Sequence, residues 1–149
     1  MKKILFLLLS LSLTASAQFE TIIEVEGNIK GLCNKNKVYA LMEVLDGQVE
    51  AVCPASQDEI ITRLNTEVGF CKQNPTTNDK GMIGLMINCK GEVVQCQMDI
   101  PTKSPELDKQ IVAVFNSFGT WQAGKLGKKE VDSYTVFGFT IVDGAFVME

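Results

Sequence analysis

Apolar and polar residues alternate most regularly over residues 81–100, GMIGLMINCKGEVVQCQMDI. The apolar side chains of each run share one face, since alternate residues of a strand point the same way. Lys90-Gly91 separates the two runs, and a glycine there tolerates the positive φ of a tight turn. The pattern predicts a β-hairpin that ends at Pro101. Its apolar faces consist of Ile83, Leu85 and Ile87, and of Val94, Cys96, Met98 and Ile100.

Two segments have the helical period instead, with apolar residues three and four positions apart. The first begins at Ser56, which with Glu59 forms a capping box. The second begins at Ser104, followed by Pro105 at the first helical position, and stops at Gly119. The apolar stripes are Ile60, Ile61, Leu64 and Val68, and Leu107, Ile111, Val114, Phe115 and Phe118.

The other β signals lie at the two ends of the chain. Thr21–Glu26 alternates, and two β-rich runs flank Asp46-Gly47, a pair typical of hairpin turns. Tyr134–Val142 belongs to the longest β-branched and aromatic run, and Asp143-Gly144 turns it back into a short tail. From Ser56 the order is helix, strand, strand, helix, strand. This order predicts an α+β fold, an antiparallel sheet with two helices packed on one face.

The first residues predict export. Two lysines precede a short apolar run that ends at Ala15-Ser16-Ala17, as in a cleaved secretory signal peptide. An uncleaved membrane anchor is the alternative, but the run is shorter than the ~20 apolar residues that a spanning helix needs. We expect a signal peptide over 1–17, a β-rich N-terminal extension over 18–54 and a main domain over 55–149. The expected location is the bacterial periplasm, without membrane insertion after cleavage.

Composition narrows the possible functions. The net charge is −4 with no basic stripe, so we expect no nucleic-acid partner. The chain has no histidine and no Cys-x-x-Cys pair, which disfavours a metal site and a thioredoxin-like role. Without an imidazole base for a serine, cysteine or threonine nucleophile, we expect no enzyme and no cofactor.

The five cysteines and the oxidising compartment predict one or two disulfides, with at least one thiol left over. Our first choice is Cys53–Cys89, because a first helix antiparallel to strand 82–88 would bring its start near the Cys89 turn. Cys33–Cys53 is the second choice, since both cysteines flank the predicted first hairpin. Cys96 faces the predicted core, so we expect it to be a free buried thiol.

Residues 56–142 resemble the C-terminal domain of TonB, the periplasmic energy transducer, and are most similar to its Bacteroidetes versions. The similarity lies in the hairpin IGLMINCKGEV and in PELDKQIVAVFNSFGTWQAGKLGKKEV. These match the family patterns "v-x-F-x-V-x-x-x-G-x-V" and "pxLDxxAlxvvxxxxxWxPGxxxGxxV". We expect structural roles for the matched residues, with Trp121 in the core rather than stacked on a ligand. The matched residues are Leu107, Asp108, Phe115, Trp121 and Gly124.

The chain departs from a complete TonB in several respects. It has no histidine for coupling to a proton channel and only 4 scattered prolines, so it has no proline-rich spacer. Cleavage would also remove any anchor. Ala123 replaces the usual proline after the tryptophan and leaves that turn less rigid.

The resemblance implies a binding module for transport across the outer membrane that adds a peptide or receptor segment as a strand. The expected edge is the last strand, with binding residues Tyr134, Val136, Gly138, Thr140 and Val142. The alternative is a structural or assembly protein of the envelope whose sheet edge is covered by residues 18–53. A covered edge would favour that alternative.

Overall fold

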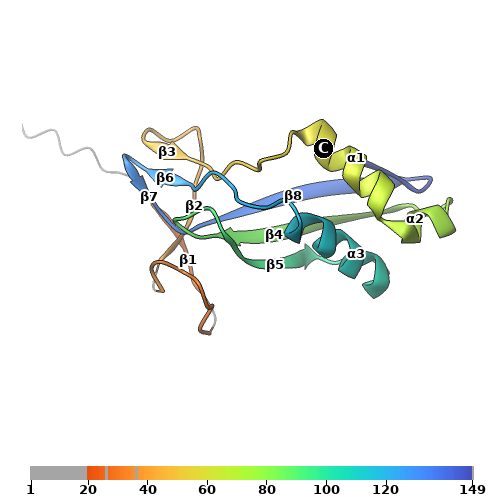
Figure 1. Cartoon of the computed structure of the whole chain (residues 1–149), viewed down its shortest axis with the longest axis horizontal. Coiled ribbons are helices and arrows are strands. Elements are labelled where there is room, and N and C mark those ends of the chain that lie inside the picture. Colours follow the sequence, from red (N-terminus) through yellow and green to blue (C-terminus); the bar gives the residue numbers. More distant parts are fainter. Residues whose placement is uncertain (1–19, 26, 36, 149) are drawn as a thin grey trace, which may run out of the picture.

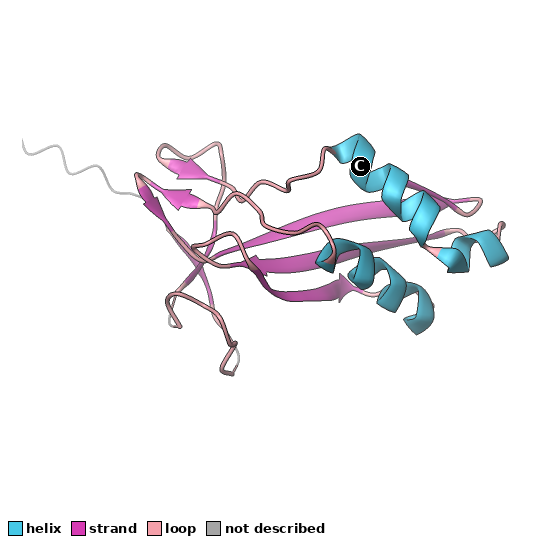
Figure 2. Cartoon of the chain, viewed as in Figure 1, coloured by secondary structure: helices cyan, strands magenta, loops and turns pink. Residues whose placement is uncertain are grey.

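The computed structural model describes residues 20–25, 27–35 and 37–148, so the expected signal peptide 1–17 lies outside it. The larger sheet has the order β1-β2-β8-β4-β5, and β9 pairs with β8 as well; β3, β6 and β7 form a second sheet. Figure 2 shows the helices at one end of the long strands and the second sheet at the other. The α+β class is therefore confirmed. The strands are β1 Thr21–Ile23, β2 Val38–Ala40, β3 Gln48–Val49, β4 Asp79–Ile87, β5 Val93–Ile100, β6 Lys125–Leu126, β7 Lys129–Glu130, β8 Ser133–Val142 and β9 Ala145–Met148.

Both predicted helices are present and begin where their caps predict. α1 spans Gln57–Glu67, and the Ser56 hydroxyl accepts a hydrogen bond from the Glu59 N–H at 3.3 Å. α3 spans Pro105–Asn116, and Ser104 accepts from the Leu107 N–H at 3.3 Å. These bonds satisfy N–H groups that have no partner inside a helix. A short α2, Gly69–Gln73, was not predicted.

The hydrophobic core lies between the helices and one face of β4 and β8. The hairpin positions Ile83, Leu85 and Ile87 are fully buried, as their shared face predicted. On β8, Phe139 and Ile141 are buried on the same face. The stripes of α1 and α3 complete this core, which includes Ile60, Leu64, Leu107, Ile111, Val114 and Phe115.

The motif after α3 packs as the sequence indicated. Trp121 is 3% exposed and meets the Phe137 ring edge-on, with ring centroids 5.8 Å apart. A Cβ on Gly124 would lie 2.5 Å from Leu41 Cδ1 and 2.8 Å from Ser133 Oγ, so a larger residue would displace these two side chains. Asp108 accepts hydrogen bonds from the N–H and hydroxyl of Thr102 ahead of α3.

The N-terminal strands pair differently from our prediction. The two runs around Asp46-Gly47 do not pair with each other. β2 instead pairs with β1 and, in parallel, with β8, while β3 pairs with β6. The larger sheet is therefore mixed rather than antiparallel. A turn follows β2, in which the Leu45 N–H donates to the Met42 carbonyl at 3.0 Å, and it directs the chain away from β2.

The disulfide is Cys33–Cys89, with the Cα atoms 6.0 Å apart, so both predicted pairings with Cys53 were wrong. The Cys89 turn meets the loop between β1 and β2 rather than the start of α1. Buried Asp132 holds the two segments together, since it accepts from the Asn34 N–H at 2.6 Å and the Cys89 N–H at 2.8 Å. Cys96 is a free, partly buried thiol, and burial raises its pKa to about 11.

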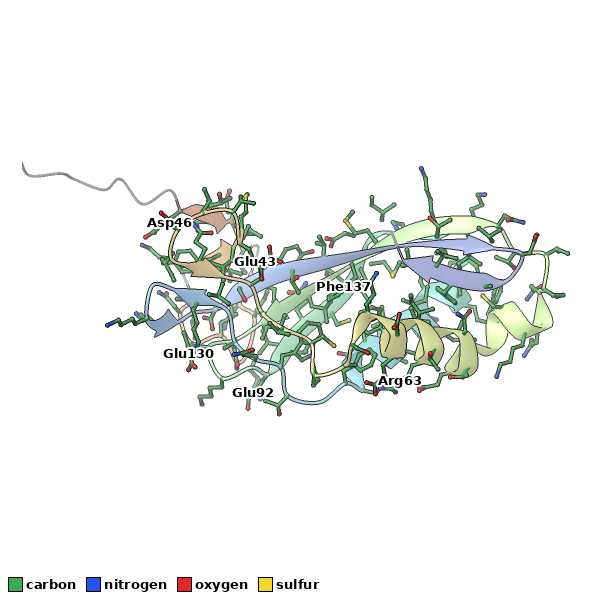
Figure 3. The ribbon with its side chains drawn as sticks, turned by 90° about the horizontal axis from the view of Figure 1, so that it is seen from above. Glu43, Asp46, Arg63, Glu92, Glu130 and Phe137 are labelled. Atoms are coloured by element: carbon green, nitrogen blue, oxygen red, sulfur yellow. A yellow bond between two sulfur atoms is a disulfide. The ribbon has the colours of Figure 1, made fainter. Side chains whose placement is uncertain are left out.

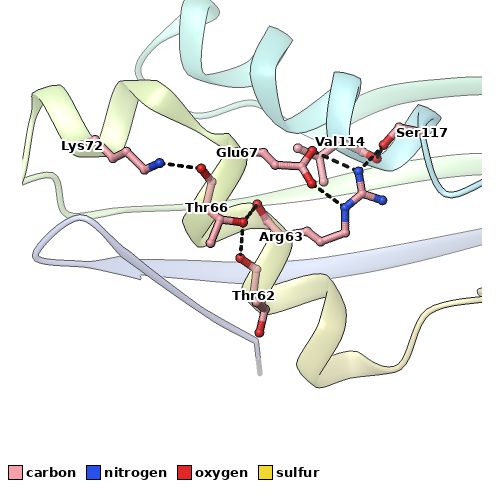
Figure 4. Close-up of polar contacts among 7 residues, drawn as sticks. All are labelled: Thr62, Arg63, Thr66, Glu67, Lys72, Val114 and Ser117. Carbon is pink, nitrogen blue, oxygen red and sulfur yellow. Dashed lines mark hydrogen bonds and ion pairs between the residues drawn. The ribbon is translucent and has the colours of Figure 1, made fainter.

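Arg63 connects α1 to the end of α3 (Figure 4). Its guanidinium donates to Glu67 at 2.5 and 3.0 Å and to the Ser117 hydroxyl at 2.7 Å. It also lies over the Phe118 ring, 4.5 Å from the centroid. The bonds to Arg63 lower the pKa of Glu67. Among the helices of the described residues, none is both long and apolar enough to cross a bilayer.

Candidate functional site

β8 carries all five predicted binding residues, but it is an interior strand over most of its length. On one side it pairs with β4 from Ser133 to Ile141. On the other side, β2 pairs with Ser133 and Tyr134, and β9 pairs with residues 139–142. The predicted edge is thus covered at both ends, at Tyr134 and at Thr140 and Val142. Among the described residues, no strand pairs with this outer side of Thr135–Gly138, which we call the β8 gap.

The backbone groups that face the gap follow from the ladder. The Tyr39 N–H donates to the Asp132 carbonyl at 2.9 Å, so Asp132 directs its backbone groups toward β2. Backbone groups alternate in direction along a strand, so Val136 faces the same side as Asp132, and Thr135 and Phe137 face β4. The Val136 N–H and carbonyl therefore point into the gap. Its side chain is 45% exposed.

A cavity of about 510 Å³ opens beside the gap. One wall is the β8 gap itself, and the other is the segment that runs from β3 to the start of α1 (Figure 1). We call it the β8 cavity. Its lining residues are Glu43, Glu50, Ala51, Val52, Cys53, Ala55, Ser56, Gln57, Ile60 and Thr135–Gly138.

Both polar and apolar residues line the β8 cavity, and two of the polar ones are carboxylates. Glu43 and Glu50 have no hydrogen-bond or ion-pair partner among the described residues. The free Cys53 thiol also lines the cavity, and burial raises its pKa. Nearby Glu59 raises it further, against a backbone hydrogen bond from Ala55 and the charge of Arg63. At neutral pH the thiol is therefore protonated and unreactive.

On the inner side of the gap, Phe137 is fixed by aromatic contacts. Its ring lies 5.4 Å from Phe115 and 5.8 Å from Trp121, measured between centroids. Tyr134, at the start of the gap, crosses the opposite face of the sheet. Its hydroxyl donates to Asp99 of β5, and its ring covers Gly84, where a Cβ would lie 2.6 Å from Tyr134 Cζ. The gap therefore lies in a strand whose side chains are held by contacts on both faces of the sheet.

A second group of potential ligands has a structural role. Cys33, Cys89 and Asp132 place their ligand atoms within 4.8 Å of one another. The two sulfurs are bonded to each other, and both carboxylate oxygens accept backbone N–H bonds. The arrangement secures the N-terminal segment to the Cys89 turn and leaves no ligand set for a metal in this oxidised form.

The sequence pattern did not indicate the cavity, Glu43 or Glu50, because these come together only through the pairing of β2 with β8 and of β3 with β6. The cover of β8 by β9 did have a signal. Asp143-Gly144 is a two-residue hairpin turn, and the AFVM that follows pairs back on Val142 to Phe139. Comparison with protein-family models, curated proteins and solved structures finds nothing that matches this chain.

Proposed function

We propose that this protein is a non-catalytic binding module that takes up a short extended peptide as an added strand in the β8 gap. The observation that carries the proposal is the outer side of Thr135–Gly138, with which no described strand pairs, beside a cavity of about 510 Å³. Strand addition of this kind takes affinity from main-chain hydrogen bonds and selectivity from side-chain pockets.

The contact is short, because both ends of β8 have internal partners. Val136 supplies the central N–H and carbonyl, and Gly138 leaves open space beside it, since a Cβ there would meet nothing within 4 Å. Tyr134, Thr140 and Val142 support the site without lying in the gap. Ordering a flexible peptide offsets much of the contact energy, so the affinity should be modest.

The resemblance of residues 56–142 to the TonB C-terminal domain supports the same function, because that family binds segments of outer-membrane receptors by strand addition. The expected partner is therefore a protein or peptide segment of the cell envelope. We propose binding without energy transduction, because this chain has no histidine, a residue through which the family couples to a proton channel.

The test is a titration with extended receptor-derived and envelope-derived peptides, read by amide exchange and chemical shifts. Binding should protect the Val136 amide. Methylation of alternate peptide nitrogens should abolish binding only where the nitrogen donates to β8, because N-methylation removes a ladder donor. Peptides methylated at the intervening positions are the matched controls. A Val136 amide already protected in the free protein would contradict an open gap.

The covered ends of β8 favour a second function, that of a structural or assembly protein of the envelope. β2 and β9 together leave little of the outer side available to a partner strand. This second function predicts that no extended peptide binds and that the Val136 amide exchanges slowly in the free protein. The same titration therefore decides between the two functions.

We propose that the protein is exported, because of the pattern of residues 1–17. The mature chain should begin at Gln18 and be recovered from the periplasm. Mass spectrometry of periplasmic material tests this proposal, and a chain that retains Met1 or fractionates only with the inner membrane would refute it.

A further inference from the structure

We infer that the segment bound in the β8 gap carries a lysine or arginine at the end that lies beside β2. This inference rests on the proposed function and specifies the chemistry of the partner. It follows from the two carboxylates that line the cavity, from the end of the cavity at which they lie, and from the small or apolar residues between its two ends.

The charged side chains that line the β8 cavity are acidic. Glu43 and Glu50 line the cavity, and no lysine or arginine of the described residues does. Neither carboxylate has an ion-pair or hydrogen-bond partner among the described residues, so both remain available to a bound cation. The whole chain has a net charge of −4, which adds to the attraction for a basic segment.

The carboxylates also occupy one end of the cavity. Ala40, the last residue of β2, pairs with Tyr134, immediately before the gap. Glu43 follows β2 and Glu50 follows β3, while the far end is formed by Ser56 and Gln57 at the start of α1. Figure 1 shows β2 and β3 toward one end of β8 and α1 toward the other. In Figure 3, Glu43 lies between Asp46 and Phe137.

Between these ends the wall opposite β8 consists of small or apolar residues, which are Ala51, Val52, Cys53, Ala55 and Ile60. A polar side chain buried there would lose its hydration without a charged partner. Successive side chains of an added strand point to opposite faces, so every second residue of the segment meets these walls. The partner is then an extended segment with small apolar residues at alternate positions and a basic residue at one end.

The experiment compares peptides that differ at one terminal residue, which is lysine, glutamine or glutamate. Each peptide is made with that residue at its first or at its last position, since the edge accepts either strand direction. At low salt, the better-placed lysine peptide should bind about tenfold more tightly than its glutamine counterpart, about threefold for each carboxylate. Added salt should reduce that advantage.

The protein variants are Glu43→Gln, Glu50→Gln and the double variant. The double variant should bind the lysine and glutamine peptides equally, and its affinity for the glutamine peptide should stay near that of the unchanged protein. Asp46→Asn is the matched control, because this exposed aspartate belongs to the same loop but does not line the cavity. It should retain nearly all of the lysine preference.

Equal binding of the lysine, glutamine and glutamate peptides would overturn this inference and leave the proposed function intact. A preference for glutamate, or a lysine preference that persists in the double variant, would overturn it as well. If none of the peptides bound, the proposed function itself would fail. Dimerisation that protects the Val136 amide would identify a second copy of the chain as the occupant and would also overturn the inference.

Discussion

The two sides of β8 are built differently. Toward β4 the ladder runs without interruption from Ser133 to Ile141. Toward the outside it consists of a two-residue parallel pairing with β2 and the pairing with β9, separated by the gap. The continuous side keeps the strand rigid, and the interrupted side leaves hydrogen-bonding groups available. An open edge of limited length gives access to one partner segment while restricting edge-to-edge aggregation.

The largest change in stability should come from the packing of α3 against β8. Phe115 is 1% exposed and contacts Phe137, so Phe115→Ala should lower the free energy of unfolding by about 3–5 kcal/mol. Val136→Ala, at the half-exposed neighbour of Phe137 on β8, should change it by only about 0.5 kcal/mol. Denaturant unfolding of both variants measures the difference. Equal losses would mean that the packing of α3 against β8 stabilises the strand no more than the half-exposed Val136 side chain does.

Removal of the disulfide should lower stability and loosen the pairing of β2 with β8 at one end of the gap. Replacing Cys33 and Cys89 with serine removes a covalent link across 56 residues. It should lower the free energy of unfolding by about 2–4 kcal/mol. Since the link secures the segment that carries β2, the Tyr134 amide should exchange faster, and the amides that face β4 should change little. Cys53→Ser, at a free thiol, is the control. An unchanged Tyr134 amide would show that β2 is held by its other contacts alone.

The smallest effect concerns Tyr134, which crosses from the start of the gap to Asp99. Burial, and then the hydrogen bond to Asp99, raise the pKa of its hydroxyl above the ordinary value of 10.0. The folded state therefore favours the protonated form. Its stabilising effect should be complete below about pH 10 and should disappear as the pH rises through the raised pKa.

Tyr134→Phe should lower the free energy of unfolding by about 0.5–1.5 kcal/mol at neutral pH and weaken the alkaline loss of stability. Unfolding between pH 7 and 11 measures both changes. Tyr39→Phe is the matched control, because the Tyr39 hydroxyl has no hydrogen-bond partner among the described residues. If the two variants lost stability in parallel with pH, the bond to Asp99 would not be responsible.

Sequence periodicity was sufficient to predict the elements whose structure is determined by residues close together in the chain. The stripes of α1 and α3, their serine caps and the alternation in β4 correspond to observed elements. The predicted apolar face of β5 was wrong in part. Cys96 and Met98 pack against the core, but Ile100 is 50% exposed. A register shift opposite Met86 and Ile87 places Val93 against the core instead of Val94. The burial of Trp121 also followed, since a helix stop two residues earlier returns the chain to the core. The close approach of Gly124 to Leu41 and Ser133 had no local signal.

The site could be predicted only in part. The strand was identified, but its pairing with β2 was not, because β2 and β8 come from segments almost a hundred positions apart. The same distance explains the wrong disulfide. We placed the start of α1 beside the Cys89 turn, whereas the bond from the Asn34 N–H to Asp132 brings Cys33 there. The acidic rim of the cavity depends on the same pairing.

The position of Asp132 in the chain also bears on the order in which contacts form during folding. Its carboxylate accepts the Asn34 N–H across a separation of 98 residues, whereas the β4–β5 hairpin closes over a short turn. Contacts between distant segments form late, because the loop they close costs entropy before the contact stabilises it. Residues 20–40 emerge early from the ribosome, yet their attachment point is completed only near the end of synthesis. We therefore expect the newly made chain to pass through an intermediate in which β8 is still open to any strand at Ser133 and Tyr134.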